Sequence, residues 1–272
     1  MEKDIKEGIA IKPCNTWGNI MKPIDMDRIK NKLDAHFGRK EFDQAERLIN
    51  YWLVEAKNGD NKRAELELQN EYMGFCRKQG RRDDAILHAE LAAEIVRELK
   101  MERTIGGATV YVNVGTVYKA FDNPNAAMSY FTKAKEVYEE NLKDDDKLLA
   151  GLYNNMGLAA VDMKQYDAAE NLYKQAINIM TKNKDGELDE AISRLNYADL
   201  LYAKYKTDPS DDYLKYGKQI EEEVETAWKL FNLDTTMRDD YYRFVCEKSA
   251  PSFGFYGYFV YEKELKKRAE LW

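Results

Sequence analysis

The sequence contains few of the residues that build covalent or metal-linked frameworks. Its three cysteines, Cys14, Cys76 and Cys246, are odd in number, far apart and without C-x-x-C spacing. This pattern argues against a disulfide framework or a zinc site, and it fits a reducing compartment. The two histidines, His36 and His88, lie in no H-E-x-x-H pattern. We expect them to be packing or surface residues, and we predict no metal site.

Long apolar runs and catalytic motifs are also absent. No stretch approaches the roughly 18 apolar residues of a membrane span, and residues 1–20 lack the apolar run of a signal peptide. We therefore predict a cytoplasmic protein that does not bind membranes. No G-x-S-x-G, Walker loop or dinucleotide fingerprint is present, and the acidic stretches 143–147 and 182–190 lack calcium-loop spacing. The sequence predicts neither an enzyme nor a cofactor.

Proline is scarce and positive charge is not in excess. Five prolines in 272 residues leave long stretches free to be helical. Charged residues make up 33% of the chain, but the net charge is −7 and the isoelectric point is near 5.2. Such a surface is mildly acidic and does not indicate nucleic-acid binding.

An internal repeat is present in the middle of the chain. Gly115 and Gly157 are 42 residues apart, within "VNVGTVY" and "NNMGLAA". Downstream, "NPNAAMSYFTKAKEVY" and "QYDAAENLYKQAINIM" align in the same register, with Phe131 opposite Tyr173. A small residue followed by a spaced alanine and aromatic residue lets two antiparallel helices approach closely, because the ring fills the space between them. The repeat predicts stacked helix pairs.

This pattern resembles the tetratricopeptide signature W-x-x-L-G-x-x-Y…A-x-x-x-F. Tyr111-x-x-Val114-Gly115-x-x-Tyr118, followed by Ala127-x-x-x-Phe131, matches it with conservative exchanges. The second copy matches equally well except for Ala160 in place of an aromatic residue. The period is similar to the longer repeats of kinesin light chains and of bacterial peptide sensors. The resemblance implies an all-α, right-handed superhelical solenoid of antiparallel helix pairs.

Weaker copies flank the central pair, and we expect the repeats to extend over residues 24–272. In the repeat 187–232, the second helix is predicted to begin after a longer loop, with Asp208 as its cap and Pro209 as its first residue. The last segment is expected to break at Ala250-Pro251 and to be a degenerate cap. The predicted segments are an N-terminal extension 1–23, repeats 24–60, 61–102, 103–144, 145–186 and 187–232, and a capping pair 235–272.

One polar position recurs two residues before the small residue of each repeat. It holds Asn31, Glu71, Asn113, Asn155 and Asn196. Asparagine is a poor residue for a helix interior, so helix propensity does not explain its recurrence. At 100° per residue, Asn155 points away from the partner helix of its own pair. The neighbouring Asn154 has no such counterpart.

The resemblance implies a peptide-binding role for this asparagine position. In kinesin light chains and Gram-positive peptide sensors, an asparagine there contacts the backbone of an extended peptide in the concave groove. An amide can do so because it carries both a donor and an acceptor. The alternative is that these amides form hydrogen bonds between helices that fix the stacking of the repeats, or are simply solvated.

Further residues fall on the same predicted face, one turn from the asparagines. Those assigned to the groove with them are Arg77, Lys78, Lys119, Leu158 and Tyr202. The basic ones predict a ligand with an acidic residue or a terminal carboxylate near that end, although solvated lysines explain them equally well. Thr116, Asp162 and Asp199 also lie on this face.

The sequence thus predicts a non-enzymatic module that binds a protein or an extended peptide. Two alternatives stay open. One is a peptide-responsive regulator acting through a partner protein, since no helix-turn-helix pattern precedes residue 24. The other is a homo-oligomeric scaffold: the aromatic stretch "SFGFYGYFVYEKEL" either caps the core or, if its rings are exposed, marks a self-association patch. Residues 1–22, with Trp17, are expected to be disordered, to cover the first repeat or to lie in the groove.

Overall fold

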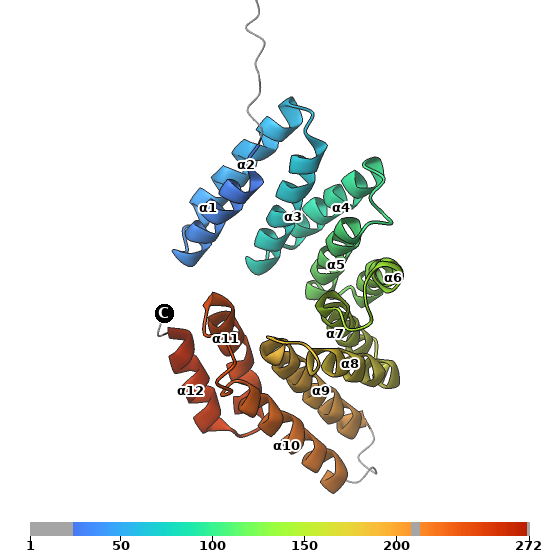
Figure 1. Ribbon diagram of the computed structural model, residues 1–272, viewed down its shortest axis with the longest axis vertical. Coiled ribbons are helices and arrows are strands. Elements are labelled where there is room, and N and C mark those ends of the chain that lie inside the picture. Colours follow the sequence, from blue (N-terminus) through green and yellow to red (C-terminus); the bar gives the residue numbers. More distant parts are fainter. Residues whose placement is uncertain (1–23, 208–212, 271–272) are drawn as a thin grey trace, which may run out of the picture. The chain divides into compact units, whose positions relative to one another are not determined.

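The computed structural model describes residues 24–207 and 213–270, and it is all-α over these ranges (Figure 1). The predicted cap at Asp208-Pro209 and the N-terminal extension lie outside the described residues. The helices are α1 (Met26–Gly38), α2 (Phe42–Asn58), α3 (Lys62–Lys78), α4 (Arg82–Glu98), α5 (Ile105–Ala120), α6 (Pro124–Asn141), α7 (Lys147–Asp162), α8 (Tyr166–Met180), α9 (Glu187–Thr207), α10 (Tyr213–Leu230), α11 (Asp240–Phe255) and α12 (Phe259–Glu270).

The chain divides into two compact units, with the boundary between Glu65 and Leu66 inside α3. In the N-terminal unit, α1 packs on α2. The Asp25 carboxylate caps α1 by accepting a hydrogen bond from the backbone N–H of Arg28 at 3.0 Å. Ile29 and Leu33 of α1 are buried. The buried residues of α2 are spaced three or four apart and are Ala45, Ile49, Leu53 and Ala56.

In the C-terminal unit, consecutive helices form packed pairs. Helix α5 packs on α6, α7 on α8, α9 on α10 and α11 on α12. Successive pairs are also in contact, because α6 packs on α7 and α8 packs on α9. The first helices touch one another as well, α5 with α7, α7 with α9 and α9 with α11. In Figure 1, α6 lies on the opposite side of α5 and α7 from α11. The C-terminal unit is therefore a helical solenoid whose first helices share one side.

The glycine positions of the repeat allow this close packing. A Cβ atom on Gly115 would lie 2.5 Å from the ring of Phe131, and one on Gly157 would lie 2.6 Å from the ring of Tyr173. Both rings are fully buried. The Asn123 side chain caps α6 and Pro124 is its first residue, which matches the local sequence signals. The contact between a small residue and an aromatic ring is the one predicted from the 42-residue spacing.

Left-handed residues close most of the tight turns between helices. Two of them, Gly80 and Gly257, are glycines with φ 71° and 85°. The others carry side chains and have φ between 51° and 60°: Lys40, Asp60, Lys100, Asp122, Lys164 and Asp185. A side chain in this region is strained, so the packing of the flanking helices holds these turns in shape.

The predicted helix break at Ala250-Pro251 is wrong. Helix α11 continues through Pro251 to Phe255, and the chain turns instead at Gly257, which has φ 85°. Pro251 is exposed, so the carbonyl group left without its helical partner can be solvated. Phe253, Phe231 and Tyr242 fill the core of this last region, and all three are fully buried. The aromatic segment therefore does contribute to a core, although Phe255, Phe259 and Val260 remain 60%, 69% and 78% exposed.

Candidate functional site

The predicted groove residues are distributed over the first helices of the pairs. In the C-terminal unit, Arg77 and Lys78 end α3, Asn113 and Lys119 are in α5, Asn155 and Leu158 in α7, and Asn196 and Tyr202 in α9. All of these are half-buried except Lys78, which is exposed. Asn31 belongs to the N-terminal unit, where it is an exposed residue of α1. The residues of α5, α7 and α9 are referred to below as the asparagine face.

Two of the asparagines form hydrogen bonds between successive first helices. The Nδ2 group of Asn113 donates to Oδ1 of Asn70 in α3 at 2.9 Å. In the same way, Nδ2 of Asn196 donates to Oδ1 of Asn154 in α7 at 3.0 Å. These amide pairs join successive first helices, which is the kind of contact that the stacking interpretation of the sequence expects. Each donor amide still has a second N–H and its own oxygen for other partners.

Asn155 differs from both. Its side chain forms no hydrogen bond within the described residues, although it is half-buried. Asn70 and Asn154 accept the bonds from the next repeat, and the equivalent position in the repeat before Asn155 is Val112. Valine has no polar side chain, so it cannot accept a hydrogen bond from Asn155. The amide in the middle of the asparagine face is thus available to a ligand.

The charges on the asparagine face and beside it, at the end of α3, are unevenly paired. Arg77 is half-buried and forms no ion pair within the described residues, and burial lowers the pKa of its guanidinium. The Lys119 ammonium lies 3.4 Å from the Asp162 carboxylate at the end of α7, so its charge is already compensated by the chain itself. A half-buried cation without a counter-ion favours an anionic group of a ligand near the α3 end.

The chain's own C-terminal region contacts the α9 end of the face. The Tyr256 hydroxyl donates to Oδ1 of Asp199 at 2.6 Å. The rings of Phe255 and Tyr202 meet edge to face with centroids 5.1 Å apart. Burial raises the pKa of Asp199, and the hydrogen bond from Tyr256 acts in the opposite direction. The connection between α11 and α12 therefore borders the site.

Sequence reasoning missed Asn70 and Tyr256, and it was wrong that Asn154 has no counterpart, because Asn70 has the same acceptor role. Asn70 and Asn154 are two periods apart, each one residue before the recurring polar position, so this spacing was the signal that could have identified them. Tyr256 carries no such signal, because its contact depends on how the degenerate last pair folds back on α9. The role of the asparagine position in ligand binding stays a prediction.

Among the residues considered for chemistry at the sequence level, His88, Cys76 and Cys246 are packed within the structure. His88 stacks on Tyr72 with ring centroids 3.9 Å apart, and its Nδ1 lies 2.6 Å from Oε1 of the buried Gln69. Cys76 and Cys246 are buried free thiols, and Cys14 lies outside the described residues. Within residues 24–207 and 213–270, no cluster of three potential metal ligands occurs, and no helix is long and apolar enough to span a membrane.

Part of this architecture matches a known family of repeats. The tetratricopeptide repeat family matches the chain twice, at residues 108–141 and at residues 149–182. No curated protein sequence matches the chain.

Solved structures with the same architecture include proteins of different kinds. BtubC (BKLC) from P. vanneervenii is 20% identical, with a TM-score of 0.65 over 75% of this chain and 79% of that one. A Podosopora anserina protein with nearly identical TPR-like repeats, assigned to the kinesin light chains, is 13% identical, with a TM-score of 0.53 over 75% and 92%. The quorum sensor NprR from B. thuringiensis, in its apo form, is 14% identical, with a TM-score of 0.56 over 89% of this chain and 63% of NprR. At these identities the similarity shows the fold alone.

Proposed function

Because the chain carries tetratricopeptide repeats in an all-α solenoid, we propose that it is a non-enzymatic module that binds an extended peptide or a segment of a partner protein. The ligand lies along the asparagine face, across α5, α7 and α9. The observation that carries this proposal is the amide of Asn155, half-buried and without a hydrogen-bond partner in the described chain, between two amides that are paired.

The chemistry of an amide suits a peptide backbone. Asn155 can donate to a backbone carbonyl group and accept from a backbone N–H, whatever the side chains of the ligand. Each such bond contributes about 0.5–1.5 kcal/mol, whereas micromolar binding requires about 8 kcal/mol. Most of the affinity and the specificity must therefore come from side-chain contacts. Arg77 supplies one of them, because its unpaired charge favours a carboxylate near the α3 end.

Selection of peptides from a random display library on the immobilised protein tests the proposal. The affinities of the selected peptides are then measured by fluorescence polarisation for wild type, Asn155→Ala and Asn171→Ala. Asn155→Ala is expected to weaken binding about three- to tenfold, the equivalent of one or two lost hydrogen bonds. Asn171 is exposed on α8, outside the asparagine face, so its variant serves as the matched control. Equal affinities of all three proteins would contradict the proposed role of Asn155.

The similarity to NprR favours a second reading of the same face, a peptide-responsive regulator that acts through a partner protein. A sensor must change its conformation when the peptide binds. The peptide must therefore bind one conformation more tightly, since a ligand with equal affinity for both does not shift the equilibrium between them. Hydrogen exchange with and without a selected peptide separates the two. Protection confined to α5, α7 and α9 indicates a passive module, and changes in distant helices indicate a regulator.

Exposed apolar residues at the C-terminal end favour a third candidate, a homo-oligomeric scaffold. Phe259 and Val260 are neighbours at the start of α12, with most of their surface exposed. Single exposed apolar residues are ordinary, but a group of them can mark a self-association surface. Light scattering across a hundredfold concentration range tests this. A monomer throughout contradicts the scaffold, and a dimer that Phe259→Asp dissociates supports it.

A further inference from the structure

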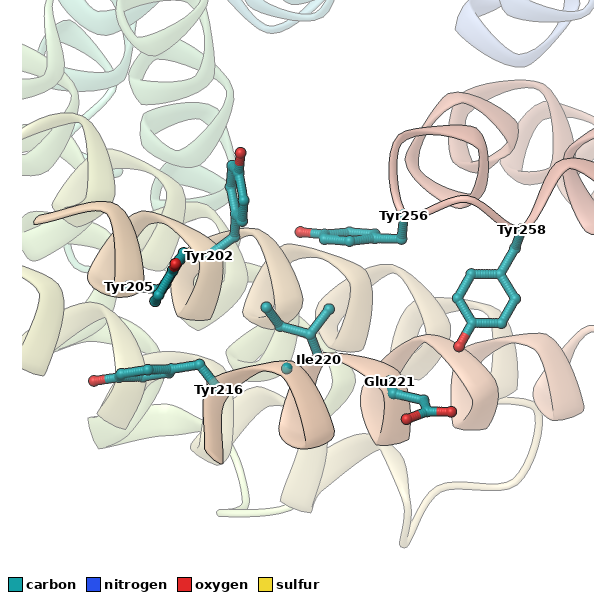
Figure 2. Close-up of a pocket in the computed structure, with 8 residues that line it drawn as sticks. Tyr202, Tyr205, Tyr216, Ile220, Glu221, Tyr256 and Tyr258 are labelled. Carbon is teal, nitrogen blue, oxygen red and sulfur yellow. The ribbon is translucent and has the colours of Figure 1, made fainter. Parts of the chain in front are cut away.

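A pocket lined by tyrosines lies where α9, α10 and the connection between α11 and α12 meet (Figure 2). Tyr202 and Tyr205 belong to α9, Tyr216 to α10, and Tyr256 and Tyr258 to the connection. The cavity volume is about 250 Å³. Elements distant in the sequence supply these rings, so no repeat position predicted the pocket.

The rings are set at steep angles to one another around the same space. Those of Tyr202 and Tyr256 have centroids 6.5 Å apart and planes inclined by 85°. Those of Tyr205 and Tyr216 are also 6.5 Å apart, inclined by 54°. Figure 2 shows the rings of Tyr202 and Tyr256 above Ile220, with those of Tyr205 and Tyr216 to its left. Each aromatic face carries partial negative charge, and several faces around one space form the arrangement that holds ammonium groups.

The charge at the edge of the pocket has the matching sign. Glu221 lines the pocket, is exposed, and forms no ion pair or hydrogen bond with the described part of the chain. Burial raises the pKa of Tyr258, and the nearby carboxylates of Glu225 and Glu221 raise it further. The chain itself already places a cation on one of these rings, since the Lys206 ammonium lies 5.5 Å from the centroid of Tyr202.

We propose that this pocket binds an ammonium group, and that the group is carried by a lysine side chain, methylated or unmodified, of the bound protein or peptide. The identification of the carrier rests on the proposed function, because Tyr202 lies both in the pocket and on the asparagine face. A ligand carboxylate would be repelled by Glu221. A neutral apolar side chain would fill the space without compensating this charge.

Choline and its neutral carbon isostere 3,3-dimethyl-1-butanol test the chemistry of the pocket on the full chain. The two differ only in the quaternary nitrogen, so an apolar cavity would bind them equally. Titrations followed by NMR are expected to show choline binding at least about fivefold more tightly than the alcohol. Equal affinities, or no saturable binding of choline, would overturn the proposal.

Variants locate the binding and separate the ring from its hydroxyl group. Tyr202→Leu is expected to weaken choline binding about fivefold, whereas Tyr202→Phe retains it because the aromatic face remains. Glu221→Gln removes an exposed charge without disturbing packing, and it is expected to weaken binding about twofold, more strongly at low salt. Tyr51→Leu, at an exposed tyrosine outside the pocket, is the control. If Tyr202→Leu fails to fold, Glu221→Gln with Tyr202→Phe decides: unchanged binding in Glu221→Gln overturns the role of the carboxylate.

The carrier of the ammonium group is tested with the library-selected peptides. Replacement of a peptide lysine by norleucine, which keeps the chain and removes the charge, is expected to weaken binding to wild type about fivefold but to change nothing for Tyr202→Leu. If choline binds selectively and no peptide lysine shows this coupling, the assignment to a partner lysine is overturned. These results are independent of the Asn155→Ala comparison, so failure of either proposal is recognised separately.

Discussion

At Gly157 a single added methyl group would lie 2.6 Å from the ring of Tyr173, which has no exposed surface. Gly157→Ala is therefore expected to lower the free energy of unfolding. Overpacking costs about 1–3 kcal/mol, and the higher helix propensity of alanine returns up to about 1 kcal/mol. Urea denaturation measures the net loss.

Gly151, in the same helix, provides the matched control. A Cβ atom there meets nothing within 4 Å, and the residue is exposed. Gly151→Ala is expected to raise the free energy of unfolding by about 0.5–1 kcal/mol, because only the propensity difference acts. A loss of stability in Gly151→Ala, or none in Gly157→Ala, would contradict this account of the repeat glycines.

The asparagines are also expected to differ in their effect on stability. Asn196→Ala removes the hydrogen bond to Asn154, whereas Asn155→Ala removes none within the described chain. Both variants gain the same helix propensity, so it cancels in the comparison. Asn196→Ala should be less stable than Asn155→Ala by about 1 kcal/mol in chemical denaturation. Equal stability would mean that the amide pair does not hold the repeats together.

At the scale of elements, a charged network joins α8 to α9. Glu170 accepts hydrogen bonds from Lys174 at 2.6 Å, from Lys204 at 2.8 Å and from the Tyr197 hydroxyl at 3.1 Å. Burial alone would raise the pKa of Glu170, but these three donors together lower it from 4.5 to about 2. Because the unfolded chain binds a proton more readily, the network stabilises the fold above pH 4.5, and this contribution disappears as the pH falls toward 2.

Glu170→Gln should therefore reduce stability at neutral pH and not at pH 2. We expect the free energies of unfolding of wild type and variant to differ by about 1 kcal/mol at pH 7, because solvent screens the interaction with Lys174, the more exposed of the two lysines. Denaturation of wild type and variant across this range measures it. A difference that is the same at pH 2 and pH 7 would exclude a role for the ionised carboxylate.

The sequence predicted these elements well where the repeat is regular. Spacing alone identified the contact of Gly115 with Phe131, because a fixed period places the same residues at the same helix contact. It failed at Pro251, where a helix continues because the proline faces solvent. It also could not predict the amide pair of Asn113 with Asn70 or the contact of Tyr256 with Asp199. These depend on the offset between neighbouring helices and on how the last pair packs, which periodicity does not encode.

At the scale of the whole molecule, the helices of the C-terminal unit contact mainly their neighbours in sequence. Eight residues of α7 are buried, between the helices on either side, whereas Leu265 is the buried residue of α12. Stability in such an array varies along its length. Amide hydrogen exchange is expected to be slowest in α7 and fastest in α12, and uniform protection of the two helices would indicate a single cooperative unit instead.

The turn residues Asp122 and Lys164 are one period apart and have nearly the same backbone angle, φ 60° and 58°. The block 123–164 thus begins and ends at equivalent points of the chain path, and it contains one copy each of α6 and α7. Spliced in a second time, the block would join to itself at a turn the protein already makes, with Gly157 meeting a second copy of Phe131 in place of the bulkier Tyr173. Duplication of the block 123–164 would therefore lengthen the solenoid by one repeat and add one amide to the asparagine face, without the design of a new turn.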